Sequence, residues 1–167
     1  METLQGFTWE FLNSLFYYDE GLVRRRVKRG PRMPHAVVGT VDGKGYLHVN
    51  VEGKFIRLHK LIYFLFNRTV PQEVDHKDRD RRNNLIGNLR GATRQQNSGN
   101  VGMFRHNTSG FKGVVYIKKK NKWDARIKIN GKQVYLGRRS TPEEASLLYE
   151  AAAREHFGEF VGKNHAD

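Results

Sequence analysis

Four polar residues within 23 positions constrain the fold of this chain more than any other feature. Asp75 and His76 are adjacent, Asn88 follows after eleven intervening residues, and Asn97 follows after eight more. A carboxylate beside an imidazole provides a hard oxygen ligand and a general base at one point, and an amide can supply a second oxygen to the same ion. We therefore expect a strand, a loop and a helix to converge around one metal ion.

This set of groups matches the requirements of phosphodiester hydrolysis. A metal ion stabilises charge on the phosphate and the leaving oxygen, while a base deprotonates water near neutral pH. In this interpretation Asp75 and Asn97 hold the ion. His76 is the base, and Asn88 holds its ring in place. Each residue alone could belong to a surface turn or a helix cap, but the combination favours the catalytic interpretation.

Composition identifies the expected partner of such a site. The chain has 30 Lys and Arg residues against 17 Asp and Glu, with a formal net charge of +13 and a sequence pI of about 10.2. A surface this positive attracts polyanions, so double-stranded DNA is the expected partner. A membrane is the alternative for a basic surface, but no apolar run approaches 18 residues and no signal peptide opens the chain. We expect a soluble, cytoplasmic protein without a membrane partner or a small-molecule substrate.

The lack of cysteine limits the chemistry of any metal site. It excludes disulfides, thiolate zinc sites and cysteine nucleophiles. A metal ion must therefore use oxygen or imidazole ligands. Carboxylate and amide oxygens favour Mg²⁺ or Mn²⁺ over zinc.

Turn-forming residues indicate a break between two domains. The segments 98–102 and 106–110 are rich in Gly, Asn and Ser and lack hydrophobic periodicity. We therefore predict a first domain at 1–100, a linker at 101–110 and a second domain at 111–167, all of the α+β class.

In the first domain, alternating and helical patterns predict a hairpin between helices. Alternation over 46–58 around a Glu-Gly turn predicts two strands. Helical spacing over 59–66 predicts a helix on that hairpin, with His59 packed in the interior and not a metal ligand. Thr93, followed three residues later by Gln, forms a capping box that places Asn97 one turn into a further helix.

These residues resemble the HNH homing endonucleases common in phage genomes, which have the ββα-metal nuclease fold. The resemblance covers roughly residues 15–100 and is specific because several spaced motifs match together. Besides the four polar residues, it is carried by Arg57-Leu58-His59-Lys60-Leu61 and Asn83-Asn84.

The resemblance assigns a role to each polar residue. It implies that Asp75 and Asn97 bind the divalent ion. It also implies that His76 is the general base and that Asn88 orients it. The chain departs from the family at one point: where the family carries an aromatic residue after Asn-Leu-x, this sequence has Arg90-Gly91-Ala92.

Beyond the linker, the sequence predicts three strands followed by a helix. Asn130-Gly131 is a strong signal for a two-residue hairpin turn, and Thr141 is suited to cap the helix. One sheet face packs on this helix, while the other, which carries Arg126 and Lys128, is expected to stay open and basic. The predicted strands cover 113–118, 123–129 and 133–136.

This second segment, from Ser109 to about Asn164, resembles the DNA-binding domain of the plant ethylene-response-factor (APETALA) family, which also occurs appended to phage HNH nucleases. The match is carried by Gly113-Val114, Trp123-x-Ala125-x-Ile127, Leu136-Gly137, Pro142-Glu143-Glu144-Ala145 and Tyr149-Glu150-Ala151-Ala152. The resemblance implies a sheet face that lies in the DNA major groove.

Only part of that contact surface is kept. Lys112 and Lys128 retain positive charge, and Tyr135 retains an aromatic ring. The plant proteins have arginines at three positions where this chain has Val115, Ile117 and Gln133. We therefore expect mainly phosphate contacts from this domain. The DNA-binding residues expected here are Lys112, Arg126, Lys128 and Tyr135.

A further basic surface is expected near the amino terminus. Six cations fall within the nine residues from Arg24 to Arg32. Such a run favours an arm along the DNA backbone, and a solvated loop is the alternative. The DNA contacts expected from this run are Arg24, Arg25, Arg26, Lys28 and Arg29.

Together these features predict a metal-dependent, homing-type DNA endonuclease that nicks one strand per active site, as a monomer or a dimer on DNA. Two alternatives remain. One is a DNA-binding regulator that has kept a nuclease-like fold without cleavage, although retention of all four polar residues argues against it. The other is a structure-specific or non-specific nuclease.

Overall fold

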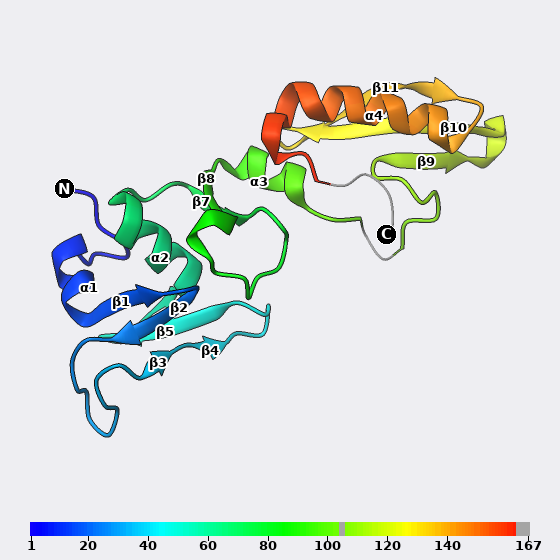
Figure 1. The fold of residues 1–167 in the computed structure, drawn as a ribbon. Helices are drawn as coiled ribbons and strands as arrows, with labels where there is room; N and C mark the ends of the chain where they lie inside the picture. Colours follow the sequence, from blue (N-terminus) through cyan, green and yellow to red (C-terminus); the bar gives the residue numbers. More distant parts are fainter. Residues whose placement is uncertain (104–105, 163–167) are drawn as a thin grey trace. The chain divides into compact units, whose positions relative to one another are not determined.

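The computed structural model describes residues 1–103 and 106–162 and divides the chain into two units, Met1–Thr93 and Arg94–Asp167 (Figure 1). Parts of the predicted linker and of the predicted second domain, including Asn164, lie outside the described residues. Both units combine helices with small antiparallel sheets, which confirms the α+β class. None of the helices in the described ranges is long and apolar enough to cross a bilayer.

The first unit opens with a capped helix and a hairpin. The side chain of Thr8 accepts a hydrogen bond from the Phe11 N–H and so caps the helix. The helix ends directly at the first strand of a sheet with strand order β1-β2-β3. The elements are α1 (Trp9–Leu15), β1 (Phe16–Asp19), β2 (Leu22–Arg25) and β3 (Val37–Val38).

A second sheet, with order β4-β5-β6, leads into the central helix of this unit. Val49 and Val51 are buried while Asn50 between them is exposed, so one face of β5 meets the core. Leu58 begins the helix, one residue earlier than the sequence pattern predicted. The elements are β4 (Thr40–Val41), β5 (Leu47–Val51), β6 (Lys54–Arg57) and α2 (Leu58–Asn67).

Helix α2 fixes the position of the strands that follow it. It contacts α1, β1 and both strands of the β5-β6 hairpin. Its side chains Leu61, Ile62 and Phe64 are almost fully buried, and burial of each contributes about 1.5–3 kcal/mol to stability. The same helix contacts the two strands of the next hairpin, β7 and β8, so the core holds that hairpin in a defined place.

The next hairpin carries the predicted Asp-His pair. Strand β7 (Glu73–His76) pairs antiparallel with β8 (Leu89–Ala92), and a short 3-10 turn, η1 (Ile86–Asn88), precedes β8. In this register Asp75 lies opposite Arg90 and His76 lies opposite Leu89. A loop over residues 77–85 connects β7 to the 3-10 turn.

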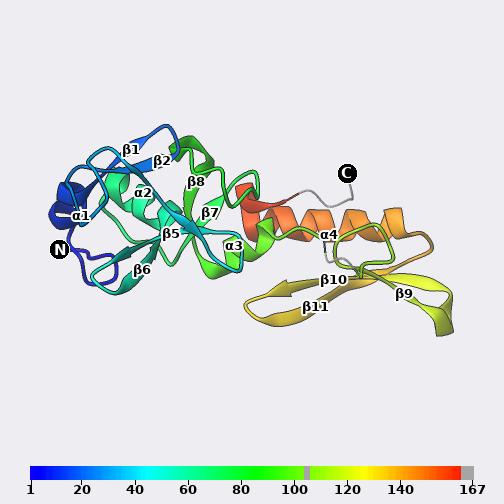
Figure 2. The same ribbon diagram turned by 90° about the horizontal axis from the view of Figure 1, so that it is seen from below.

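The second unit contains the predicted three strands and helix. Its sheet has the order β11-β10-β9, and α4 packs against it (Figure 2). Asn130 and Gly131 both have positive φ, as the two-residue hairpin signal requires. Thr141 and Glu144 form a capping box at the start of α4. The elements are α3 (Arg94–Asn100), β9 (Val114–Ile117), η2 (Lys118–Lys120), β10 (Lys122–Ile129), β11 (Lys132–Arg139), α4 (Pro142–Phe157) and η3 (Gly158–Phe160).

Helix α3 is packed within this second unit. At Gly99 an added Cβ would lie 2.6 Å from Cγ of Phe157, so only glycine permits this approach of the two helices. The Gly162 N–H donates to the carbonyl oxygen of Gly99 at 3.2 Å. The Lys112 ammonium donates to the carbonyls of Gly99 and Val101 at 2.8 and 2.6 Å. The end of α3 therefore depends on residues far along the chain.

Candidate active site

The buried imidazole of His76 has a defined hydrogen-bond partner. His76 is the last residue of β7, and its Nε2 lies 3.0 Å from Oδ1 of Asn84, which is also buried. An amide oxygen only accepts hydrogen bonds, so Nε2 of the neutral ring carries the proton. Nδ1 then keeps its lone pair, as a general base requires.

Asn88 makes different contacts from those expected. Its amide nitrogen donates to Oδ1 of Asp78 at 2.9 Å and to the carbonyl of Asn83 at 2.8 Å. Its Oδ1 accepts from the Asp78 N–H at 3.1 Å. In the structure Asn84 occupies the place at the His76 ring that the sequence pattern gave to Asn88, while Asn88 closes the loop that carries Asn84.

The Asp78 carboxylate is the centre of this loop. Its burial acts to raise the pKa, but hydrogen bonds from the Asn88 and Asn83 amides outweigh that effect and lower the pKa of Asp78. The carboxylate is therefore ionised near neutral pH, and its Oδ2 accepts from Asn83 at 2.6 Å. These bonds bring the 77–85 loop back to the start of β8 and define the position of Asn84.

The candidate metal ligand Asp75 is buried and forms an ion pair. Both Nε and Nη2 of Arg90 lie 2.9 Å from its Oδ2, as the register of β7 and β8 allows. The Asp75 carboxylate is therefore a hard oxygen donor, and the guanidinium of Arg90 is paired with it. The sequence gave no sign of this pair, because the cross-strand register was not known.

A side chain at Gly91, where the sequence departs from the HNH pattern, would meet Tyr63 of α2. A Cβ at Gly91 would lie 2.7 Å from the Tyr63 hydroxyl oxygen and 3.3 Å from Cβ of Pro71. The Tyr63 side chain thus occupies the space beside β8 where a larger residue at Gly91 would lie. The departure from the family pattern leaves the β7-β8 hairpin packed.

His59 lies beside His76, and it is packed in the interior as expected. The two ring centroids are 5.0 Å apart, and His59 is only 3% exposed. Burial, and then the charges of His76, Lys60 and Arg57, lower the pKa of His59 to about 3. His59 is therefore neutral across the physiological range and adds no charge beside the candidate base.

Tyr46 is a neighbour of this histidine pair that the sequence pattern did not single out. Its ring centroid lies 5.1 Å from that of His59 and 6.1 Å from that of His76. The guanidinium carbons of Arg57 and Arg81 lie 4.3 and 4.9 Å from the same centroid. The alternating pattern placed Tyr46 on a strand, but only the folded chain reveals its neighbours.

Asn97 lies on α3, as predicted, and is half-buried. Helix α3 belongs to the second unit, whereas Asp75, His76 and Asn88 belong to the first. The role of Asn97 as a second ligand stays a prediction.

The donors around Asp75 fit a hard, mostly hydrated ion. The described residues contain no group of three or more His, Cys, Asp or Glu side chains arranged to hold a metal. A hard ion bound at Asp75 would combine carboxylate oxygen with water ligands. Mg²⁺ and Mn²⁺ accept such coordination, whereas zinc sites in proteins use three or four protein ligands.

Three of the amino-terminal arginines that were predicted to contact DNA are instead buried or bonded within the folded chain. Arg25 is 2% exposed, and burial followed by the charges of Arg32 and Arg29 lowers its pKa. Arg24 pairs with a neighbouring carboxylate, and Arg26 donates to two main-chain carbonyls. Lys28 and Arg29 remain exposed. Arg25 cannot reach DNA in this conformation, because its side chain is buried and its guanidinium lies 5.5 Å from the centroid of the Phe16 ring.

On the sheet of the second unit, an ion-pair cluster forms part of the predicted open face. Asp124 is 1% exposed and accepts hydrogen bonds from Arg126 and Arg138. Lys128 and Tyr135 are exposed. Lys112, by contrast, is half-buried and donates to main-chain carbonyls. Lys128 and Tyr135 are therefore the most available of the contacts predicted in this unit.

Comparisons with known proteins show which sequences this chain resembles. The profile of a family described as HNH endonuclease matches residues 57–98, from the end of β6 into α3. An uncharacterized HNH endonuclease of Acanthamoeba polyphaga mimivirus is 36% identical over 128 residues, which cover 75% of this chain and 66% of that protein. Protein 3.8 of Escherichia phage T7 is 31% identical over 107 residues, which cover 63% of this chain and 88% of that protein. No solved structure matches the chain.

The matched segment contains all four polar residues that the sequence pattern singled out, and it also contains Asn84. The β7-β8 hairpin places Asp75 and His76 side by side with their partners Arg90 and Asn84. Residues 57–98 therefore form an HNH endonuclease domain, and the chain spans just under two thirds of the length of the mimivirus HNH endonuclease to which it is similar.

Proposed function

We propose that the chain is a metal-dependent, homing-type endonuclease that binds duplex DNA and nicks one strand per active site. The observation that carries this proposal is the hydrogen bond between Nε2 of His76 and Oδ1 of Asn84, which assigns the role of base to Nδ1 of a residue that directly follows Asp75 on β7. The viral origin of both relatives supports a role on DNA inside a host cell.

We assign β7, β8 and α3, in that chain order, to the ββα-metal motif of the family. HNH nucleases generally depend on a divalent metal. Asp75 and Asn97 would hold Mg²⁺ or Mn²⁺. The ion would supply Lewis-acid stabilisation of the phosphate and of the leaving oxygen. The ion pair with Arg90 must then adjust, because Arg90 and the ion share one carboxylate.

The base step follows from the geometry of His76. Nδ1 takes a proton from a water molecule, and the resulting hydroxide attacks phosphorus in line with the 3′ oxygen. The bond from phosphorus to that oxygen breaks, and the oxygen gains a proton from solvent. The products are a 5′-phosphate and a 3′-hydroxyl. Asn84 keeps the ring fixed during this step, since positional errors of 1 Å can cost about 100-fold in rate.

Binding is assigned to four cations and one aromatic residue, of which all but the half-buried Arg126 are exposed. Each phosphate contact releases counterions and adds affinity without reading sequence. We assign these contacts to Lys28, Arg29, Arg126, Lys128 and Tyr135, the last three in the APETALA-like unit. A monomer would nick, and a double-strand break would require a dimer or two successive events.

One observation favours a second candidate, a DNA-binding protein that does not cleave. Arg90 already neutralises Asp75, which reduces the attraction of that carboxylate for a metal ion. In such a protein the HNH fold would serve only as a DNA-binding surface.

A cleavage assay separates the two candidates. Supercoiled plasmid and genomic DNA are incubated with the full chain and Mg²⁺ or Mn²⁺, with excess EDTA as the control. Metal-dependent nicks with 5′-phosphate ends are expected, and mapping of the ends distinguishes a long target from unselective cutting. DNA binding without any nick in either metal would support the second candidate.

A further inference from the structure

Two arginines from different segments meet at one aromatic ring near the candidate base. Arg57 ends β6, and Arg81 lies in the loop that follows His76. Their guanidinium carbons lie 4.3 and 4.9 Å from the centroid of the Tyr46 ring. Stacking on an aromatic face restrains an arginine while leaving the edge of its guanidinium available for hydrogen bonding.

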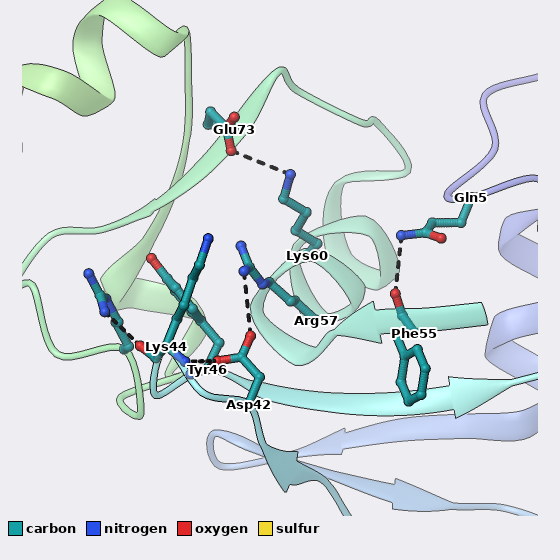
Figure 3. Close-up of polar contacts among 9 residues, drawn as sticks. Gln5, Asp42, Lys44, Tyr46, Phe55, Arg57, Lys60 and Glu73 are labelled. Atoms are coloured by element: carbon teal, nitrogen blue, oxygen red, sulfur yellow. Dashed lines mark hydrogen bonds and ion pairs between the residues drawn. The ribbon is translucent and has the colours of Figure 1, made fainter. Parts of the chain in front are cut away.

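The carboxylate of Asp42 stabilises the 42–46 turn, which ends at Tyr46. Oδ1 of Asp42 accepts from the N–H groups of Lys44 and Tyr46 at 2.8 and 2.9 Å, and Oδ2 lies 3.4 Å from Nη2 of Arg57 (Figure 3). The hydrogen bond from the Tyr46 N–H is the largest influence that lowers the pKa of Asp42. Asp42 therefore stays ionised and orients Arg57 against the ring.

Arg81 is restrained by the same turn. Its Nη1 donates to the carbonyl oxygen of Lys44 at 2.6 Å, which joins the loop after His76 to the turn before β5. The structure thus fixes both arginines from two sides: the ring of Tyr46 and a polar contact to the 42–46 turn. Restrained side chains lose little further entropy when they bind a ligand.

Most hydrogen-bond donors of the two arginines remain available. Over the described residues, Arg57 makes one side-chain hydrogen bond and Arg81 makes one, and each guanidinium has five N–H groups. The Arg57 side chain is 37% exposed, and Arg81 is exposed. Figure 3 shows the Lys44 ammonium, the Tyr46 hydroxyl and the Arg57 guanidinium pointing to the same side.

The cluster carries excess positive charge beside the active site. Of the side chains of Lys44, Arg57 and Arg81, only that of Arg57 forms an ion pair among the described residues, with Asp42, so the charge of the cluster is only partly neutralised. The ring at the centre of the cluster lies 6.1 Å from the His76 ring. An anion that binds there would be next to the phosphate that the water activated by His76 attacks.

We propose that Arg57 and Arg81, stacked on Tyr46, form a clamp for one backbone phosphate of bound DNA adjacent to the scissile phosphate. The planar guanidinium groups offer paired N–H donors that match phosphate oxygens. The clamp positions the strand and does not read its sequence. This inference rests on the proposed cleavage at His76, and it adds a substrate-positioning site to it.

Four arginine variants of the full chain test the clamp. Arg57→Gln, Arg81→Gln and the double variant remove the charges, and Arg82→Gln is the matched control, an exposed neighbour in the same loop without a side-chain contact among the described residues. Each is compared for the salt dependence of DNA binding, the nicking rate at saturating DNA and the melting temperature.

The clamp predicts two effects of removing these charges. Loss of one phosphate contact lowers the slope of log affinity against log salt by about 0.9. Because the clamp positions the scissile strand, the double variant should also nick roughly 10- to 100-fold more slowly at saturating DNA. Arg82→Gln should change neither quantity. Tyr46→Leu, which removes the ring on which both guanidinium groups stack, should lower the nicking rate.

The slope of log affinity against log salt tests the clamp independently of the proposed cleavage. If wild type binds DNA but does not nick it, the proposed function fails while the slopes of the arginine variants still decide the clamp. An unchanged slope in the double variant overturns the clamp, and so does a fall in melting temperature without any change in slope. If Arg57→Gln does not fold, Arg81→Gln carries the test, since its residue lies on an exposed loop.

Discussion

Nε2 of His76 lies 3.0 Å from Oδ1 of Asn84, and both side chains are buried. Asn84 is eight residues from His76 in the chain and reaches it because the 77–85 loop folds back on β7. This contact selects the histidine tautomer that leaves Nδ1 as a base. The loop between the two strands is therefore part of the proposed active site.

Asn84 and Asn88 should differ in their effects when replaced. Asn84→Ala removes the direct partner of His76, so the nicking rate at saturating DNA should fall roughly 10- to 100-fold. Asn88→Ala acts only through the loop and should have a smaller effect on rate, with a lower melting temperature. Single-turnover nicking and thermal melting of both variants check this. A larger rate loss in Asn88→Ala than in Asn84→Ala would return the orienting role to Asn88.

The buried His59 should make the stability of the protein depend on pH. Its pKa is about 3 in the folded chain against 6.5 for the unperturbed group, so only the unfolded chain gains this proton as pH falls from 6.5 to 3. Its contribution to stability is complete above pH 6.5 and declines by roughly 1.4 kcal/mol per pH unit within this window. Urea unfolding at pH 7 and pH 5 measures the decline.

The His59 effect has a simple control. His59→Phe removes the titrating group and should flatten the dependence of unfolding free energy on pH. His156→Gln, at an exposed position on α4, should leave the wild-type dependence in place. Equal dependence in His59→Phe and wild type would show that another group is responsible.

The pair between Asp75 and Arg90 provides a metal test that does not require activity. Arg90→Gln removes one cation from a buried carboxylate, and loss of one partner of a buried pair costs about 3–5 kcal/mol. A metal ion at Asp75 should recover part of this loss, because binding to the native state stabilises it. The melting temperature of Arg90→Gln should therefore rise more with Mn²⁺ than that of wild type. No difference, or the same rise in a variant that also carries Asp75→Asn, would argue against a metal at Asp75.

Helix α3 should depend on the carboxy-terminal helix. The sequence suggests that a chain ending near residue 104, which lies outside the described residues, would fold and keep its metal site, with most of its DNA affinity lost. The packing of Gly99 on Phe157 leads to a different expectation for the helix that carries Asn97. In the full chain, Phe157→Ala should cost roughly 3–5 kcal/mol and slow nicking at saturating DNA. Leu147→Ala, at a position 64% exposed on the same helix, is the control and should do neither.

Local features of the fold were predictable, because they depend on a few neighbouring residues. The capping box at Thr141 and the turn at Asn130-Gly131 both form as their sequences indicate. The contact of Asn84 with His76 and the burial of Arg25 were not predictable, since both depend on how distant segments pack. A run of arginines has the same composition whether its side chains face solvent or the core.

The most direct test of the proposed chemistry is the nicking activity of His76→Ala. Single-turnover nicking of supercoiled DNA in Mg²⁺ is measured for wild type and for the variant, together with the affinity of each for the same DNA. Loss of the base should reduce the nicking rate by roughly 10²- to 10⁴-fold, while affinity stays within a few-fold because binding comes from distributed phosphate contacts. A variant that nicks at the wild-type rate would contradict the assignment of His76 as the base.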